Sequence, residues 1–595
     1  MLPRLWHCNV FGDWTPNMFQ RTVIAVLILV CLSICSRIAT AASDRPNVVL
    51  VMTDDQGYGD LGIHGNDQVV TPNLDRFARE GVQFSRFYVS PVCAPTRASL
   101  MTGRNYYRTG VIHTSRGGAK MHGDEVTIAE VLGEAGYATG IFGKWHLGDA
   151  FPLRPQDQGF AESLVHRSGG ISQTPDQPNS YFNPLLWKNG EPVRSRGYCT
   201  DVFFDAALNF IEQHCDEPFF AYIPTNAPHT PLEVADKYTQ PYLDKGLDET
   251  TARVYGMVQN IDENFARLLQ RLEELGLREN TLVIFLTDNG PQQQRFNGGL
   301  RGRKSQTYEG GIRVPCFVQW PQRLKGGRTV DRIAAHIDLL PTIAAACDAG
   351  RNAIQRPLDG VSLLPLLDDA SGDAVTSWPE RALFFQCHRS LTPKAFQNCS
   401  VVTQQFKLVG SPGTFSREDF DSATEAKFEL YDLLADRGEQ NDLASQQPAV
   451  LQRLKAQYED WFADVRSSRK FTPGVIQVGD PQAPSTHLCR YQDGSWADGR
   501  STGWPVRVVR SGRYRAVVRR GETPGELRLR ARWQGKEQIV QLDRRDATTE
   551  LSLPIGMGLL ELVLVDKAGD EVELLGNATV GDVTLTGPIE TSTKD

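Results

Sequence analysis

Acidic residues follow two apolar segments of the chain, and their spacing could create a site for a hard cation. The run NVVLVM at 47–52 leads into Asp54-Asp55, and the run LVIFL at 282–286 leads into Asp288-Asn289. Continuous apolar runs are typical of buried parallel strands, and ligands of such sheets bind beyond the carboxyl ends of the strands. Three carboxylates and one amide there would offer only oxygen ligands, which suit calcium or magnesium better than zinc. Either pair alone could be an ordinary turn, because Asp, Asn and Gly are common turn residues.

A cysteine at the start of a predicted helix is the second chemical feature. Cys93 is followed by Pro95 and Arg97 in the segment VCAPTRASLMTGR at 92–104. Proline suits the first turn of a helix, which puts Cys93 at the N-terminus, where free amides and the helix dipole favour an anion. Arg97 lies four residues further on, one turn along the same face. A lone cysteine before a helix is usually structural, so the whole segment is more informative than the thiol.

The segment around Cys93 resembles the signature of the type I sulfatases, members of the alkaline phosphatase superfamily. The resemblance lies in Cys93-x-Pro95-x-Arg97 and in Thr102-Gly103-Arg104, with Thr96 where many members have serine. Further segments resemble other motifs of the family in the same order along the chain: 54–60, 143–148, 228–231, 287–290, 304–311 and 428–441. The similarity extends over residues 47–465, which is most of the chain.

The resemblance implies a nucleophile made by oxidation of Cys93. In this family the cysteine is converted after synthesis to formylglycine (3-oxoalanine), and the hydrated aldehyde attacks sulfur. A formylglycine-generating maturation enzyme is therefore an expected partner. The resemblance also implies one calcium ion, held by the modified Cys93 and by Asp54, Asp55, Asp288 and Asn289. A sulfate monoester is a poor electrophile because its oxygens repel nucleophiles, and a divalent cation neutralises that charge.

The other catalytic residues are also implied by the family pattern. Arg97 and Lys144 are expected to hold the hydrated aldehyde and the sulfate. His146 is expected to remove a proton from the second hydroxyl, so that sulfate is expelled and the aldehyde reforms. His229 or Lys304 is expected to protonate the oxygen of the departing alcohol. Taken singly, each histidine could be structural and Lys304 could be surface charge.

The elements that must position these residues alternate between strand and helix patterns from Asn47 to about Val465. Besides the two apolar runs, we expect strands at 138–142, 218–223 and 313–320 and helices at 127–135, 201–214, 251–275 and 338–349. This alternation is typical of an α/β domain with a central, mostly parallel sheet flanked by helices, and the resemblance implies an alkaline-phosphatase-like core. A smaller α+β section follows, with strands at 382–386, 401–409 and 428–433 and a helix from 448 to about 465.

The pattern changes after about Phe471, where short alternating runs separated by turn residues predict a β-sandwich. We therefore predict four parts: a leader at 1–42, a catalytic α/β domain at 43–375, an α+β subdomain at 376–470 and an accessory β-sandwich at 471–595. Residues 500–545 hold thirteen Lys and Arg against four Asp and Glu. The arginines of 527–533 alternate with apolar residues and share one face, which is either a solvated strand face or a surface for an anionic polymer.

The N-terminal residues indicate export. Arg21, the apolar run at 22–34 and the small residues at 39–42 form the pattern of a cleaved signal peptide. The run is shorter than the roughly 20 residues that a membrane-spanning helix requires, so we expect no stable membrane span after cleavage. The expected location is the periplasm, the extracellular space or a lumenal compartment. None of the eleven cysteines forms a CxxC pair, and Cys387 and Cys399 are either a disulfide or two buried thiols.

Composition narrows the function further. A net charge of -8 over 595 residues does not suggest a nucleic-acid-binding protein.

The expected substrate is a sulfated carbohydrate or an aryl sulfate. Two alternatives stay open: a phosphate or phosphonate ester hydrolase of the same superfamily, and a glycan-binding protein without turnover if Cys93 is not oxidised.

Overall fold

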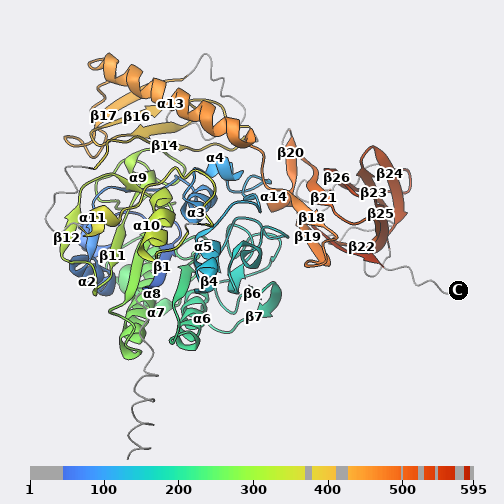
Figure 1. The fold of residues 1–595 in the computed structure, drawn as a ribbon, viewed down its shortest axis with the longest axis horizontal. Helices are drawn as coiled ribbons and strands as arrows, with labels where there is room; N and C mark the ends of the chain where they lie inside the picture. The colour runs from blue at the N-terminus through green and yellow to red at the C-terminus, as the bar shows by residue number, and fades with distance from the viewer. Residues whose placement is uncertain are drawn as a thin grey trace, which may run out of the picture. The chain divides into compact units, whose positions relative to one another are not determined.

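The computed structural model describes residues 45–589, apart from 351, 369–377, 391, 411–425, 498–499, 520–527, 543–546 and 570–581. The predicted leader at 1–42 lies outside these residues. Helices and strands carry the labels of Figure 1. The four-part division stays a prediction, whereas the fold class can be compared with the observed elements.

A ten-stranded sheet organises the α/β region (Figure 1). Its order is β12-β2-β11-β9-β1-β8-β4-β5-β6-β7. In that order the strands span Arg328–Val330, Val82–Phe84, Cys316–Gln319, Thr281–Thr287, Asn47–Thr53, Phe219–Pro224, Ala138–Lys144, Glu162–His166, Leu185–Lys188 and Glu191–Arg194. The strands from β9 to β5 are parallel to one another, and β11, β6 and β7 pair antiparallel to their neighbours. The prediction of a mostly parallel central sheet is therefore confirmed.

Helices cover both faces of this sheet, because alternate residues of a strand point to opposite sides. In β1, Val48, Leu50 and Met52 pack in one apolar cluster, whereas Val49 and Val51 pack in another. The first cluster includes α3 (Cys93–Thr102), α5 (Ile128–Glu134) and α10 (Leu339–Ala346), and the second includes α2 (Pro72–Glu80), α6 (Cys199–Gln213) and α8 (Glu249–Glu274). Shorter helices are η1 (Gly62–His64), α4 (Tyr106–Thr109), η2 (Pro155–Gln158), α7 (Asp236–Asp244), α9 (Glu309–Ile312), η3 (His336–Asp338) and α11 (Leu364–Asp368).

Two segments predicted as single strands are interrupted. The segment 313–320 divides at Pro315 into β10 (Arg313–Val314) and β11, because proline has no N–H to donate. β10 joins a separate three-stranded sheet with β3 (Phe87–Tyr88) and β13 (Ala334–Ala335). The segment 401–409 divides into β15 (Cys399–Val402) and β16 (Phe406–Gly410), with a turn in which the Thr403 N–H donates to the carbonyl of Phe406.

The smaller α+β section is an antiparallel sheet with a long helix. The strand order is β14-β15-β16-β17, with β14 at Leu383–Gln386 and β17 at Phe428–Asp432. The helix α13 spans Pro448–Arg469 and buries Leu454, Tyr458, Phe462 and Val465, which recur at helical spacing. This arrangement agrees with the predicted strands and helix, apart from the division of 401–409.

The C-terminal region forms two further sheets. The strands β18-β21-β26-β23-β24, with β20 beside β21, make one sheet, and β19-β27-β22-β25 make the other. From β18 to β27 the elements span Ile476–Val478, Ser485–Cys489, α14 at Arg490–Asp493, Ser495–Ala497, Arg500–Val508, Gly512–Arg519, Arg528–Trp533, Lys536–Gln541, Thr548–Leu553, Gly556–Val565 and Asp582–Ile589. Both sheets contribute to one apolar cluster that includes Trp504 and Tyr514, as a sandwich requires. Arg532 pairs with Glu537 and Glu561, which favours the solvated-face interpretation of the arginines.

Two expectations about the whole chain concern cysteines and membranes. Cys387 and Cys399 are buried thiols and form no disulfide with each other. Within the described ranges no helix has the length and apolar character needed to cross a membrane.

Candidate active site

The carboxyl ends of four neighbouring strands supply most of the predicted site residues. β9, β1, β8 and β4 lie side by side and run parallel. Their ends lead into Asp288-Asn289, Asp54-Asp55, His229 and Lys144, with His146 two residues beyond the last. Because these strands run in one direction, segments far apart in sequence reach the same edge of the sheet.

The helix α3 brings the cysteine to this edge. It begins at Cys93, as predicted, and its first turn includes Pro95. Cys93 is 3% exposed, and burial raises the pKa of its thiol against the opposing effects of Lys144 and Lys304. The thiol therefore stays protonated at neutral pH and is poorly suited to act as a thiolate nucleophile.

Each of the three buried carboxylates contacts a cationic side chain. The Arg97 guanidinium donates to Oδ2 of Asp288 at 2.8 Å, and Lys144 forms a close ion pair with Asp54. The Nζ of Lys304 lies 2.6 Å from Oδ1 of Asp55. Buried charges require such partners, because an unpaired ion costs several kcal/mol, on the order of its desolvation energy. The predicted metal ligands and the predicted cationic residues therefore form one connected network.

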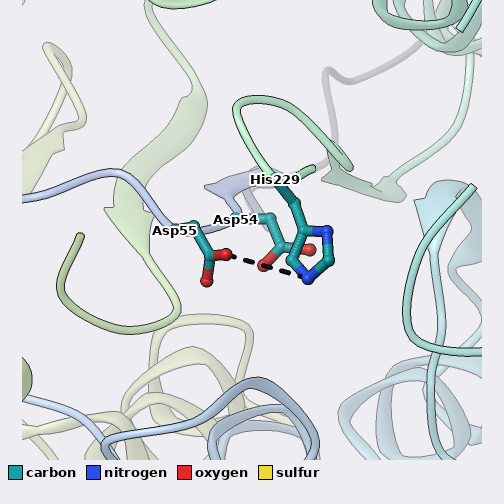
Figure 2. Close-up of side chains that lie close together, drawn as sticks. All are labelled: Asp54, Asp55 and His229. Atoms are coloured by element: carbon teal, nitrogen blue, oxygen red, sulfur yellow. Dashed lines mark ion pairs between the residues drawn. The ribbon is translucent and has the colours of Figure 1, made fainter. Parts of the chain in front are cut away.

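The cluster of Asp54, Asp55 and His229 has the geometry of a cation site. One ligand atom from each lies within 4.8 Å of the others (Figure 2). His229 donates its Nδ1 proton to the Thr230 carbonyl at 2.6 Å, so Nε2 carries the lone pair when the ring is neutral. Burial and the nearby Lys304 lower the pKa of His229 to about 3, which keeps the ring neutral. Nε2 and Oδ2 of Asp55 are then two acceptors that face each other, as ligands of a shared cation do.

Unpartnered oxygen atoms support the same interpretation. Oδ1 of Asp54 and Oδ1 of Asn289 are buried and have no hydrogen-bond donor among the described residues, while Nδ2 of Asn289 donates to Asp55 at 2.8 Å. A buried acceptor without a partner costs roughly 1–3 kcal/mol, which a bound cation would offset. Burial and the neighbouring Asp54 raise the pKa of Asp288 to about 6, another sign of crowded negative charge. Gln56 also buries unpartnered amide atoms here and had no role assigned from sequence.

Known proteins are similar to this chain in sequence. The sulfatase family profile matches residues 46–349, and the profile of the N-sulphoglucosamine sulphohydrolase C-terminal region matches 303–465. Arylsulfatase A of Homo sapiens is 33% identical over 511 residues, which are 76% of this chain and 93% of that protein. The chain belongs to the sulfatase family. It is therefore a sulfuric ester hydrolase.

Two further relatives extend the comparison of this sulfatase. N-acetylgalactosamine-6-sulfatase of Canis lupus familiaris is 32% identical over 380 residues, 57% of this chain and 69% of that protein. A solved structure of Ps i-CgsB in complex with k-i-k-neocarrahexaose has a TM-score of 0.62 and 28% identity, and the match covers 72% of this chain and 94% of that one. The predicted alkaline-phosphatase-like fold class is thereby confirmed.

A pocket of about 410 Å³ opens onto the residues of this sulfatase that could react with an ester. Of the predicted residues, Cys93, His146, His229 and Lys304 line it. Arg97, Lys144 and the three aspartates are buried and are not among its lining residues. Sequence reasoning missed other lining residues, which stand on loops without a recognisable motif: Thr114, Ser115, Gln173, Gln292, Arg303 and Arg389.

His146 is held in a defined orientation within the pocket. Its Nε2–H donates to the Thr114 carbonyl at 2.9 Å, which leaves Nδ1 as a buried acceptor with no donor in the part of the chain that the structure describes. Burial, together with the positive charge of Lys144, keeps the pKa of His146 well below its ordinary value. The ring therefore stays neutral and can accept a proton. Gly169 packs against it so closely that a Cβ there would lie 2.7 Å from the imidazole.

Proposed function

We propose that this sulfatase hydrolyses sulfate monoesters of carbohydrates through a formylglycine derived from Cys93 and a bound calcium ion. The observation that supports it most strongly is the meeting of three buried carboxylates with a buried, protonated thiol at one sheet edge. A thiol in this state is a poor nucleophile, whereas its oxidation product would offer a hydroxyl beside the cation site.

The proposed ligands are Asp54, Asp55, Asp288, Asn289 and the modified residue 93. They offer oxygen atoms only, which suits calcium. When bound, the cation would neutralise sulfate oxygens and increase the electrophilicity of sulfur. His229 stands close enough to Asp55 to be considered as a further ligand, and a nitrogen ligand would shift the preference towards a transition metal. Metal analysis of the purified protein distinguishes a calcium site from a transition-metal site.

The remaining side chains have separate tasks in this proposal. Arg97 and Lys144 hold the sulfate and the hydrated side chain of residue 93 through charge and hydrogen bonds. His146 accepts a proton at Nδ1, where the neutral ring has a lone pair. Lys304 is the better placed proton donor to the departing alcohol, because Asp55 keeps it charged whereas His229 is neutral. These assignments make Lys304 the general acid and His146 the general base.

The substrate class and the cellular location follow from more indirect arguments. A relative is named for the 6-sulfate of N-acetylgalactosamine, and a similar structure holds a neocarrahexaose. We therefore favour sulfated carbohydrates, with aryl sulfates as synthetic substrates. The expected leader at 1–42 would export the chain to a periplasmic, extracellular or lumenal site, after or during maturation of Cys93 by a formylglycine-generating enzyme. The described core and the accessory sandwich at 471–595 would then act outside the cytoplasm.

The test is an assay of the matured protein on matched esters. The protein is produced together with a formylglycine-generating enzyme, and the peptide containing residue 93 is examined by mass spectrometry. Release of inorganic sulfate from 4-nitrophenyl sulfate and from sulfated saccharides is then compared with release of phosphate from 4-nitrophenyl phosphate. Sulfate release that requires both calcium and the oxidised residue supports the proposal. Faster phosphate release, or turnover by a protein that retains the thiol, contradicts it.

A further inference from the structure

A buried arginine joins the two loops that carry most of the proposed cation ligands. Arg295 lies in the loop after β9, downstream of Asp288 and Asn289, and its side chain is 1% exposed. Its Nε–H donates to Oδ1 of Asp60 at 2.8 Å, and Nη2 donates to the backbone carbonyl of Asp55 at 3.0 Å. Both acceptors belong to the loop that follows β1. Arg295 therefore connects the ends of two paired strands, β1 and β9.

Every nitrogen of the Arg295 guanidinium has an acceptor. Nη2 also donates to Oδ2 of Asp60, and Nη1 donates to Oε1 of Gln293 at 3.1 Å. The Asp60 side chain is fully buried, so the two residues form a buried salt bridge. Replacement of such a bridge by apolar residues is often neutral for stability, because desolvation offsets the attraction. Stability alone therefore does not explain the pair, whereas the contact with Asp55 connects it to the cation site.

The backbone of Asp55 has an unusual conformation. Its φ is 63°, in the left-handed region that residues other than glycine rarely adopt. A residue keeps this conformation where the surrounding structure holds its peptide groups. The Asp55 N–H donates to Oδ1 of Asp288 at 3.2 Å, and the Asp55 carbonyl accepts from Arg295. Rotation to an ordinary φ would move the two peptide groups relative to each other, so both hydrogen bonds would not persist.

The direction of the Asp55 carboxylate depends on this backbone conformation. Its Oδ1 accepts from Nδ2 of Asn289 at 2.8 Å, and its Oδ2 lies 2.8 Å from Nζ of Lys304 and 3.7 Å from Nε2 of His229. At an ordinary φ the Cα–Cβ bond would point elsewhere, and the carboxylate would leave the cluster in Figure 2. Arg295 thus controls where a proposed ligand points, although its guanidinium offers no ligand atom.

The same ion pair closes the loop after β1. Oδ2 of Asp60 accepts from the Gly57 N–H at 2.6 Å, and the Asp60 N–H donates to the Gly57 carbonyl at 3.1 Å. The Gly59 N–H donates to Oδ1 of Asn297 at 3.2 Å, and a Cβ at Gly59 would lie 2.5 Å from the Asn297 Cα. The two loops are therefore in direct backbone contact, which leaves Arg295 little freedom to place its hydrogen bonds elsewhere.

We propose that Arg295 is a positioning residue of the cation site and holds the Asp55 peptide so that the Asp55 carboxylate points to the cation. The inference rests on the proposed function, because it requires that Asp55 binds calcium. Groups that orient a metal ligand commonly contribute about 10–100-fold to metal affinity. Arg295 should therefore change the affinity for calcium, and it should change turnover only through calcium.

Two variants separate orientation of the ligand from stability of the fold. Arg295→Met alone would leave the Asp60 carboxylate buried without its cationic partner. It is therefore combined with Asp60→Asn, whose amide oxygen can still accept the Gly57 N–H. Arg295→Lys is the second variant, because an ammonium keeps the charge opposite Asp60 but loses the planar fork that reaches Asp60 and Asp55 together.

The matched control is a buried ion pair of another part of the catalytic region. Arg86 is 4% exposed, pairs with Asp331 and donates to the backbone carbonyl of Gln404, so Arg86→Met is combined with Asp331→Asn. Calcium is removed from each matured protein with a chelator, and the Kd for calcium is measured by isothermal titration calorimetry. The unfolding temperature without calcium reports the stability of the fold. Sulfate release from 4-nitrophenyl sulfate is measured over a range of calcium concentrations.

We expect both Arg295 variants to bind calcium about 10–100-fold more weakly than the wild type, with turnover restored at saturating calcium. The matched control should change the unfolding temperature and leave the Kd unchanged. An unchanged Kd in a folded Arg295 variant, or turnover that stays low at saturating calcium, overturns this inference alone. If neither variant folds, Arg295 is a residue of the fold and the inference is wrong. A wild type that neither binds calcium nor releases sulfate overturns the proposed function as well.

Discussion

Nε2 of His229 lies 3.7 Å from Oδ2 of Asp55, although both atoms are acceptors when the histidine is neutral. The ring is neutral because its buried position and the neighbouring Lys304 lower the pKa of His229 to about 3. Oδ2 also accepts from Nζ of Lys304 at 2.8 Å, and a cation bound between Oδ2 and Nε2 would use the lone pair of the histidine as well. Removal of the Asp55 carboxylate should therefore have a clear effect on metal binding.

Asp55→Asn should abolish calcium binding and turnover. The substitution removes one negative charge from the cation site and the ion pair that holds Lys304 at 2.6 Å. Calcium at about 100 times its Kd should stabilise the wild type by about 2.7 kcal/mol, and this gain should be absent in the variant. Thermal unfolding with and without calcium measures the difference. Asp368→Asn, at an exposed carboxylate paired with Arg323, is the control.

A different metal preference would alter the ligand assignment. If zinc raises the unfolding temperature of the wild type and calcium does not, the oxygen-only ligand set is wrong. His229→Ala should then lose the zinc effect, because a nitrogen ligand would be missing.

Cys93→Ala should lower kcat by at least about a thousandfold, as removal of a nucleophile does in other hydrolases. The fold should survive, since alanine fits the first turn of α3 and Cys93 forms no disulfide. Cys215→Ala is the matched control, because Cys215 is partly exposed and lies outside the pocket. Sulfate release and far-ultraviolet circular dichroism are measured on both. Equal loss in the two variants would point to a general defect in folding.

His146→Ala should lower kcat by about 10²–10⁴-fold, the usual contribution of a positioned general base. Its Nδ1 is buried without a donor, so a proton acceptor disappears while the Thr114 carbonyl loses one hydrogen bond. Steady-state kinetics on 4-nitrophenyl sulfate separate kcat from KM. His214→Gln, at a partly exposed histidine that pairs with Glu162 and Glu217, should leave both unchanged. A rise in KM without a fall in kcat would assign His146 to binding instead.

Local patterns predicted the parts of the site that depend on strand ends. The apolar runs became β1 and β9, and their acidic termini meet because the strands pair in parallel, Thr53 beside Thr287. The start of α3 at Cys93 followed from Pro95. The division of 313–320 also had a local signal, because Pro315 has no N–H to donate to a neighbouring strand. The apolar residues around it nevertheless favoured the prediction of one continuous strand.

Other features depend on tertiary packing and had no sequence signal. Arg389 reaches the pocket from the loop after β14, and nothing near it in sequence marks a binding residue. Lys120 donates to the carbonyl of Asp493 across 373 positions of the chain. Such long-range contacts follow from how the sheets pack, and short-range spacing does not encode them.

Asp493 should make stability depend on pH. Burial raises the pKa of this carboxyl from 3.8 to about 6, although Lys120 opposes the shift and the Cys489 N–H donates to Oδ2 at 2.9 Å. A carboxyl whose pKa is higher in the folded state binds its proton more tightly there. Its stabilising contribution is therefore complete below pH 3.8 and is lost as the pH rises through about 6. The loss amounts to about 2–3 kcal/mol, from the difference between the two pKa values.

Asp493→Asn should remove this part of the pH dependence, because the amide oxygen can accept the Cys489 N–H but does not ionise. Thermal unfolding between pH 4 and pH 7 is measured for the wild type, Asp493→Asn and the exposed control Asp216→Asn. We expect the variant to match the wild type near pH 4 and to exceed its stability near pH 7, by about 2–3 kcal/mol from the same linkage. Burial and the neighbouring Asp493 raise the pKa of Asp149 to about 7, so Asp149 also titrates in both proteins and loses the repulsion from Asp493 in the variant. The difference between the two curves therefore reports Asp493 together with its effect on Asp149. If Asp493→Asn is less stable than the wild type by the same amount at every pH, the prediction is wrong. The ionised carboxylate would then not be the destabilising form, and the hydrogen bond from the Cys489 N–H would dominate.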